Sequence, residues 1–192
     1  MSIASLRVRS HEAGRCRIIK YQGSGANSPP QSLSAMATEI ERKFLVKSDE
    51  WRTLATGTIY RQGYLSAKKG CTVRVRLAGN QGYLTIKGLT QGVSRAEYEY
   101  PIPAEDAQEM LDNLCDRPLI EKTRYKIEYA GLIWEVDEFA GENQGLIIAE
   151  VELPDENYNF EPPDWIGQDV SNDSRYYNAN LVQYPYSQWS EK

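Results

Sequence analysis

Glu39-Ile40-Glu41-Arg42-Lys43 is the stretch of sequence that decides the fold. In an extended strand its two carboxylates and its lysine project from one face, while Ile40 and Arg42 project from the other. Side chains two residues apart on one face lie roughly 6.5–7 Å from each other. Like charges held at that spacing repel, so such a row is unfavourable unless a group of opposite sign lies between its members.

The same spacing returns along the chain, with the signs separated strand by strand. The further rows are Glu97/Glu99, Glu135/Asp137, Glu150/Glu152, Arg74/Arg76 and Lys122/Arg124/Lys126. Any one of these segments alone is better explained as an ordinary half-exposed antiparallel strand. A solvent-facing sheet, however, usually mixes signs so that cross-strand neighbours attract. Together the segments therefore favour charged rows that face one another and accept a divalent metal ion and a polyanionic phosphate.

Alternation of apolar and polar residues predicts about eight antiparallel strands after Thr38. The predicted strands are 38–46, 58–66, 71–78, 82–88, 93–101, 119–130, 132–139 and 146–153. Opposite the charged rows, side chains such as Trp134, Tyr98 and Tyr100 form an apolar face, which we expect helices and loops to cover. Short helices are predicted at 48–55, at 104–115 and in the last 25 residues. Closing the strands gives a mainly β barrel with a charged lumen, the inverse of a packed barrel interior.

The composition is that of one globular domain. The chain has 192 residues, enough for one substantial core and too few for two domains of ordinary size. No apolar run approaches the roughly 20 residues that a membrane span requires, so we expect no association with a membrane. Cys16, Cys71 and Cys115 are widely spaced and His11 is the single histidine. This pattern argues against a disulfide framework and a zinc site, and predicts a cytoplasmic protein.

The first 36 residues differ in kind from the rest. The chain carries a net charge of -5, of which this segment contributes +4, so the remainder carries -9. So acidic a domain is not expected to bind nucleic acid. Ser, Gly and Arg dominate residues 1–36, which predicts disorder. Their Arg and Ser content also suits a transit peptide, but no amphipathic helix is evident, and we favour Met36 as the physiological start of a single domain over 37–192.

The motifs, in their order, resemble the CYTH family of triphosphate tunnel metalloenzymes over residues 38 to about 182. They are Glu39-x-Glu41-x-Lys43, Arg74-x-Arg76, Lys87, Glu97-x-Glu99, Glu121-Lys122-x-Arg124-Tyr125, Trp134-Glu135-Val136-Asp137-Glu138-Phe139, Ala149-Glu150-Val151-Glu152-Leu153 and Asp173-x-Arg175-Tyr176. The first motif alone is a poor signature, but the ordered set is specific. The resemblance implies an eight-stranded closed antiparallel tunnel that binds a triphosphate and one or two Mg²⁺ or Mn²⁺ ions.

The resemblance also implies a role for each charged row. Its metal ligands correspond to Glu39, Glu41, Glu150 and Glu152, with Glu97, Glu99 and Asp137 as further or water-mediated ligands. Its substrate clamp corresponds to Lys43, Arg74, Arg76, Lys87, Arg124 and Arg175. This division suits the chemistry, because hard divalent cations select carboxylate oxygens and guanidinium groups match phosphate oxygens.

Two further side chains bear on activity. Lys122 corresponds to a family lysine implicated in activating water, and the cations around it, Arg124 among them, are expected to lower its pKa. Tyr64 either projects into the tunnel and shapes substrate choice or simply packs, as most strand aromatics do.

The resemblance favours hydrolysis of inorganic triphosphate, or of another short triphosphate. We expect this small molecule to be the binding partner, and we expect the enzyme to be a monomer or a homodimer. The enzymatic alternative is a class IV adenylate cyclase, which the same family includes. That alternative is weaker because the His-Phe pair of the cyclase signature and an obvious nucleobase cradle are absent from the sequence. A third reading is a module that holds polyphosphate or a nucleotide without turnover, although the chain keeps both the metal set and Lys122.

Overall fold

The computed structural model describes residues 40–190, except 69, 92–93 and 156. The predicted disorder of residues 1–36 and the start at Met36 therefore lie outside the described residues, as does Glu39. Both domain boundaries stay predictions. Within the described part of the chain, no helix is long and apolar enough to cross a membrane.

Among the residues that the structure describes, nine antiparallel strands form one sheet in the order β5-β4-β3-β2-β6-β7-β8-β1-β9. The strands are β1 Ile40–Val46, β2 Thr58–Lys68, β3 Cys71–Ala78, β4 Gln81–Gln91, β5 Ser94–Ile102, β6 Ile120–Tyr129, β7 Leu132–Phe139, β8 Ile147–Leu153 and β9 Ile166–Asp169. The helices are η1 Glu50–Thr53, α1 Ala104–Asn113, η2 Gly141–Asn143, η3 Ser174–Tyr176, α2 Asn178–Gln183 and η4 Tyr186–Gln188. The mainly β, antiparallel prediction is confirmed, and β1 to β8 match the predicted segments to within a few residues.

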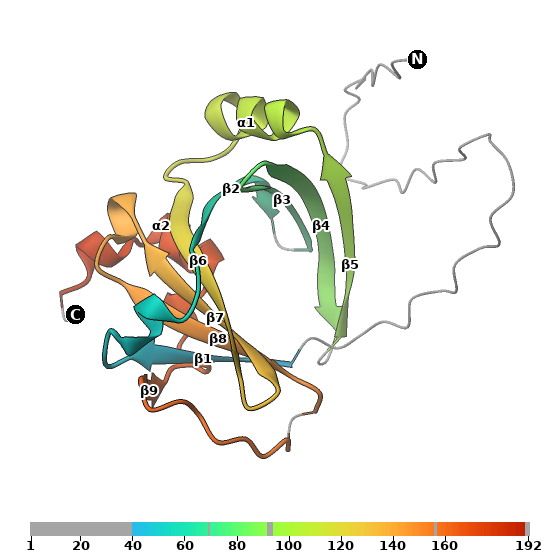
Figure 1. Cartoon of the computed structure of the whole chain (residues 1–192). Helices are drawn as coiled ribbons and strands as arrows, with labels where there is room; N and C mark the ends of the chain where they lie inside the picture. Colours follow the sequence, from blue (N-terminus) through green and yellow to red (C-terminus); the bar gives the residue numbers. More distant parts are fainter. Residues whose placement is uncertain (1–39, 69, 92–93, 156, 191–192) are drawn as a thin grey trace, which may run out of the picture. The chain divides into compact units, whose positions relative to one another are not determined.

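The sheet differs from the predicted closed barrel in two respects. Across the described residues its hydrogen-bonded order begins at β5 and ends at β9, and these two edges do not pair. The sheet instead curls, so that β4 and β5 stand opposite β7 and β8 (Figure 1). The unpredicted ninth strand pairs with the end of β1, where Phe44 lies opposite Asp169 and Val46 opposite Ile166. β9 is only four residues long, which is too short for an alternation of apolar and polar residues to be recognised in the sequence.

The convex face of the sheet carries the main apolar core. Over β1, β6, β7 and β8 this core centres on Trp134, which is fully buried and packs against Phe44 and Trp165 with ring centroids 5.7 and 5.8 Å away. A separate buried cluster lies over β3 and β4, where α1 contributes Ala107 and Leu111 and β3 contributes Val75. The expected covering of the apolar face by helices and loops is confirmed for these strands.

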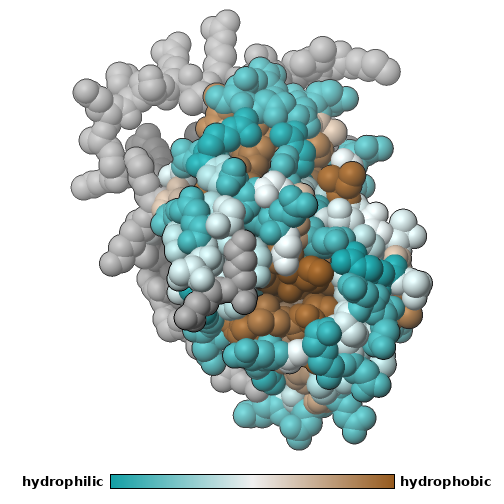
Figure 2. Space-filling view, turned by 90° about the vertical axis from the view of Figure 1, so that its left-hand side faces the viewer, coloured by the Kyte–Doolittle hydropathy of each residue, from teal (hydrophilic) through white to brown (hydrophobic). Residues whose placement is uncertain are grey.

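The edge strand β5 departs from that expectation. Tyr98 and Tyr100 remain 49% and 52% exposed, because α1 packs on β3 and β4 and leaves the outer face of β5 open. On a different side of the molecule, apolar side chains gather in a hollow within an otherwise largely polar surface (Figure 2).

The last helices pack on the concave face, which the sequence did not reveal. Ile120, Phe139 and Ile148 each lie two residues from a charged member of a row and share its face. They form a buried cluster with Leu181 of α2 and with Trp189. The charged face therefore ends, on this side, at an apolar layer closed by the C-terminal segment.

Candidate active site

The strand register brings the charged rows onto one concave face. Glu41 lies opposite Glu152, and Lys43 lies opposite Glu150. The side chains then separate into two groups. The first cluster, on β1, β6, β7 and β8, consists of Glu41, Lys43, Lys122, Arg124, Glu135, Asp137 and Glu150. The second cluster, on β3, β4 and β5, consists of Arg74, Arg76, Thr85, Lys87, Glu97 and Glu99.

Lys43 is the centre of the acidic end of the first cluster. Its Nζ donates to Glu41 and, over 2.5 Å, to Oε1 of Glu150, and the residue is only 9% exposed. Burial lowers the pKa of Lys43, but the charges of Glu150 and Glu41 outweigh that effect and raise it. Burial and the neighbouring Glu150 raise the pKa of Glu41. Two crowded carboxylates thus share one ammonium group.

Glu150 joins this end of the cluster to its basic end. Its second oxygen, Oε2, accepts a hydrogen bond from Nη2 of Arg124 over 2.8 Å. Burial opposes ionisation of Glu150, yet the charges of Lys122, Lys43 and Arg124 hold its pKa at about 2. Glu150 is therefore an anion across the physiological pH range, with a cation on each oxygen.

Arg124 and Lys122 meet at the buried Asp137. Arg124 donates from Nε to Oδ1 over 2.6 Å and from Nη2 to Oδ2 over 2.5 Å, and Lys122 pairs with Oδ2 as well. Asp137 is fully buried and the Lys122 side chain is 3% exposed. Burial lowers the pKa of Lys122, Asp137 opposes the change, and Arg124 adds to it. The predicted direction is correct, but its main cause is loss of water and only secondarily the neighbouring cations.

The second cluster is arranged around Glu99. Its two oxygens lie 3.0 and 3.1 Å from Nη2 of Arg76, and Oε2 lies 3.4 Å from Nη2 of Arg74. Lys87 pairs with Glu97 over 2.7 Å on the same face. Burial, reinforced by Arg76, lowers the pKa of Arg74. The Nε atoms of both arginines are buried and have no hydrogen-bond partner among the described residues, which leaves this cationic pair incompletely satisfied.

Aromatic side chains that sequence reasoning missed lie among these cations. The Tyr60 ring centroid is 6.0 Å from Cζ of Arg76 and 5.4 Å from Cζ of Arg124, so it links the two clusters. The Tyr83 ring also packs on Arg76, with its centroid 5.0 Å from Cζ of that arginine. Such contacts hold a guanidinium group in place by attraction to the ring face. The spacing of Tyr60 and Tyr83 in the sequence carries no signal of this.

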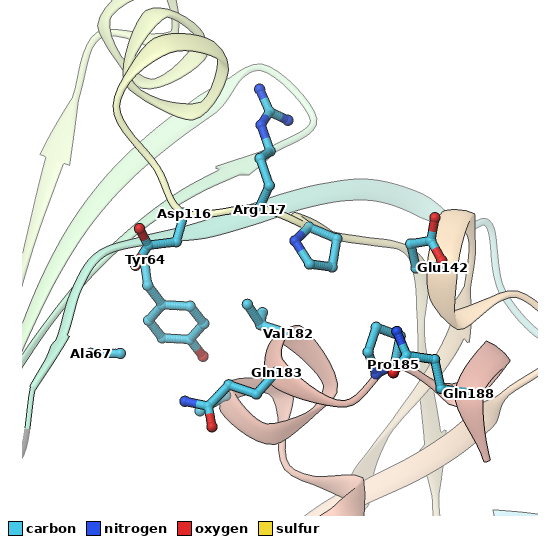
Figure 3. A pocket seen from close by; sticks show the side chains of 11 residues that line it. Tyr64, Ala67, Asp116, Arg117, Glu142, Val182, Gln183, Pro185 and Gln188 are labelled. Atoms are coloured by element: carbon cyan, nitrogen blue, oxygen red, sulfur yellow. The ribbon is translucent and has the colours of Figure 1, made fainter. Parts of the chain in front are cut away.

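Tyr64 is buried and has neighbours on two sides. Gln62 donates a hydrogen bond to its hydroxyl over 3.3 Å on the concave face. The ring also lines a cavity of about 660 Å³ and faces Val182 and Gln183 of α2 (Figure 3). The described lining of this cavity includes none of the predicted site residues. Tyr64 therefore packs, as one interpretation of the sequence predicted, and its hydroxyl lies on the charged face. A role for Tyr64 in substrate choice stays a prediction.

The structure also places Glu152 and Arg175. Glu152 is an exposed residue of β8 that lies opposite Glu41, next to the acidic end of the first cluster. Arg175 pairs with Asp173 over 2.6 Å and lies 5.0 Å from the Trp189 ring centroid. Glu39 lies outside the described residues. The structure thus assembles Lys43, Glu41 and Glu150 at one point and Arg74, Arg76 and Glu99 at another.

The donor set at the acidic end fits a hard divalent cation. Glu41, Glu150 and Glu152 supply carboxylate oxygens from the paired strands β1 and β8, and such oxygens are what Mg²⁺ and Mn²⁺ prefer. Within the described residues, no three acidic, histidine or cysteine side chains lie close enough together to coordinate one metal ion as they stand. The Glu41 and Glu150 carboxylates are turned toward Lys43. The pKa of Glu41 is raised by burial and by the charge of Glu150, so these two acids repel each other at this point.

The fold and the site together define a class of protein in which a curled antiparallel sheet carries two clusters of paired acidic and basic side chains on its concave face. The family model of the CYTH domain matches residues 37–186, and the chain belongs to this family. The resemblance recognised in its motifs is confirmed.

Individual relatives agree. The chain is 55% identical over 156 residues to an inorganic triphosphatase of Acetivibrio thermocellus, covering 81% of this chain and 100% of that protein. It is 38% identical over 153 residues to an inorganic triphosphatase of Nitrosomonas europaea, covering 76% and 97%. A crystal structure of an inorganic triphosphatase is 34% identical, with a TM-score of 0.61 over 77% of this chain and 95% of that one.

Proposed function

We propose that this protein hydrolyses inorganic triphosphate, or another short triphosphate, to phosphate and a diphosphate product, with Mg²⁺ or Mn²⁺ as cofactor. The observation that carries the proposal is the arginine pair Arg74 and Arg76 on the face that also bears Glu41, Glu150 and Glu152. The names of the related triphosphatases support the same substrate class. The acidic charge accords with a small-molecule substrate and no nucleic-acid partner, and the cysteine pattern accords with a cytoplasmic enzyme. We propose a monomer or a homodimer.

The chain's own residues divide the work. Arg74, Arg76 and Lys87 donate hydrogen bonds to phosphate oxygens and oppose the charge that develops on them. Arg124 does the same from the first cluster. A metal ion held by Glu41, Glu150 and Glu152 supplies further neutralisation of phosphate charge when bound.

Lys122 is proposed to orient the attacking water or to accept its proton at Nζ. Burial favours the neutral amine that this role requires, and Asp137 fixes the Nζ position. The water then attacks a terminal phosphorus in line with the leaving diphosphate oxygen. One P–O bond forms and one breaks, so that one water and one triphosphate give one phosphate and one diphosphate.

One panel of assays tests the proposal. Phosphate release is measured from tripolyphosphate, ATP and thiamine triphosphate, with Mg²⁺, with Mn²⁺ and with EDTA, while cyclic AMP is followed in the ATP samples. We expect the fastest release from tripolyphosphate and its loss in EDTA. Cyclic AMP as the main product indicates the cyclase alternative, and binding without release of phosphate indicates a binding module. Either result contradicts the proposal.

A matched pair of variants adds a control. Arg76→Met removes a proposed clamp residue, and we expect it to depress turnover strongly. Arg61→Met removes an arginine from the opposite face of β2, where Arg61 pairs with Asp112 and Glu121. We expect this second variant to retain turnover, so that a general loss of positive charge is distinguished from loss of the clamp.

A further inference from the structure

Thr85 lies at the middle of the second cluster. The register of the sheet sets it opposite Arg74 on β3 and opposite Glu99 on β5. It is fully buried, although it is a polar residue on the charged face. A buried hydroxyl is costly unless it is hydrogen-bonded, so its partners reveal what it does.

The hydroxyl of Thr85 has partners of opposite charge. Its Oγ1 donates to Oε2 of Glu99 over 2.8 Å and accepts from Nη2 of Arg74 over 3.1 Å. A threonine hydroxyl has one proton and two lone pairs, so the carboxylate takes the proton and the guanidinium uses a lone pair. Hydrogen bonds to charged groups are the stronger kind. Thr85 therefore ties the two ions together.

Glu99 carries this constraint to a second arginine. Both of its oxygens accept from Nη2 of Arg76, at 3.0 and 3.1 Å. Arg74 and Arg76 are like charges two residues apart on one strand face, and Glu99 is the opposite charge that lies between them. Its oxygens are directed at the arginines and at Thr85, which is the arrangement of a group that organises cations.

We infer that Thr85 is a positioning residue of the triphosphate clamp, which fixes Glu99 and thereby holds Arg74 and Arg76 in place for phosphate. The inference rests on the proposed substrate class and deepens it. Without the hydroxyl, the Glu99 carboxylate loses a hydrogen bond that fixes its orientation. The two guanidinium groups that pair with Glu99 are then held less firmly. The phosphate oxygens then meet a less ordered pair.

The test compares Thr85→Val, which keeps the shape and removes the hydroxyl, with Thr85→Ser, which keeps the hydroxyl. Tripolyphosphate binding is measured by calorimetry in EDTA, and KM and kcat are measured with metal. We expect Thr85→Val to weaken binding about tenfold, with a similar rise in KM and a smaller change in kcat, and Thr85→Ser to restore most of the loss. Thr123→Val is the control, because Thr123 lies on the opposite face of β6, and we expect binding like that of the wild type.

The inference is wrong if Thr85→Val binds tripolyphosphate like the wild type, or if Thr85→Ser is as weak as Thr85→Val. A fall in melting temperature without a change in affinity also overturns it, because that result indicates a merely structural role. If Thr85→Val fails to fold, Thr85→Cys takes its place as the variant with a weaker donor. Binding in EDTA separates the two proposals: wild-type protein that binds but never hydrolyses triphosphate refutes the proposed function and leaves the Thr85 comparison decisive.

Discussion

Removal of the Lys43 ammonium should tighten metal binding. Nζ of Lys43 lies between Glu41 and Glu150, two of the carboxylates proposed to hold the metal ion. A divalent cation at those oxygens has to displace the ammonium group or bind beside it. Lys43→Met removes this competitor and leaves the carboxylates in place, so we expect a lower Kd for Mn²⁺.

The size of the effect follows from Coulomb's law. Two unit charges 4 Å apart interact with about 4 kcal/mol at an effective dielectric constant near 20, and a divalent ion doubles the figure. Water screens much of this, because the Glu41 side chain is 43% exposed. Loss of the ammonium also lets water reach the carboxylates. We therefore expect a net gain of about 1–2 kcal/mol, which is about tenfold in Kd.

Calorimetric titration of Mn²⁺ at neutral pH without substrate measures this effect. Lys126→Met is the matched control, because Lys126 also pairs with an acid, Glu135, but is 60% exposed at the end of its row. We expect that control to change Kd less than about twofold. Mn²⁺ binding to Lys43→Met that is equal to or weaker than binding to the wild type refutes the reasoning.

Two further predictions concern packing on the two faces of the sheet. Leu181→Ala should cost about 2–5 kcal/mol in the free energy of unfolding measured with denaturant, because Leu181 is fully buried and closes the apolar end of the face; a loss under about 1 kcal/mol would show that the C-terminal segment packs weakly. Burial raises the pKa of the Cys115 thiol to about 11, so at pH 8 little thiolate exists. In a background lacking the other cysteines, iodoacetamide should modify it roughly twentyfold more slowly than an ordinary cysteine, with the rate rising toward pH 11; an ordinary rate contradicts the raised pKa.

The strands were predictable because their chemistry repeats with a period of two. In β7, Trp134 and Val136 alternate with Glu135 and Asp137, so one face had to be core and the other charged. A one-residue slip in register would have buried the wrong row. The short β9 offered no such repeat. The closure of the sheet was also beyond prediction, since alternation fixes which face a side chain occupies and says nothing of which edges pair.

Most charged members of the two clusters could be predicted from the sequence, but their contacts could be predicted only in part. The rows identified Arg74, Arg76 and Glu99, but a lone threonine such as Thr85 in an apolar-polar strand carries no signal until its cross-strand neighbours are known. For Lys122 the direction of the pKa change was foreseen, while its main cause is burial, which depends on tertiary packing. That packing is not written into the spacing of Lys122 and Arg124.

The pairing of charges within each cluster has a consequence for ligand binding. Glu150 pairs with both Lys43 and Arg124, and Glu99 pairs with both Arg74 and Arg76. The sheet can therefore fold without bringing bare like charges together. Glu41 and Glu150 would hold a metal ion in competition with Lys43, whose ammonium group would then be available to phosphate, while Arg124 keeps its hydrogen bonds to Asp137. Metal and triphosphate should accordingly strengthen each other's binding by the same factor, as linkage requires, and in Lys43→Met this mutual effect should shrink, because the ammonium group that becomes available is gone.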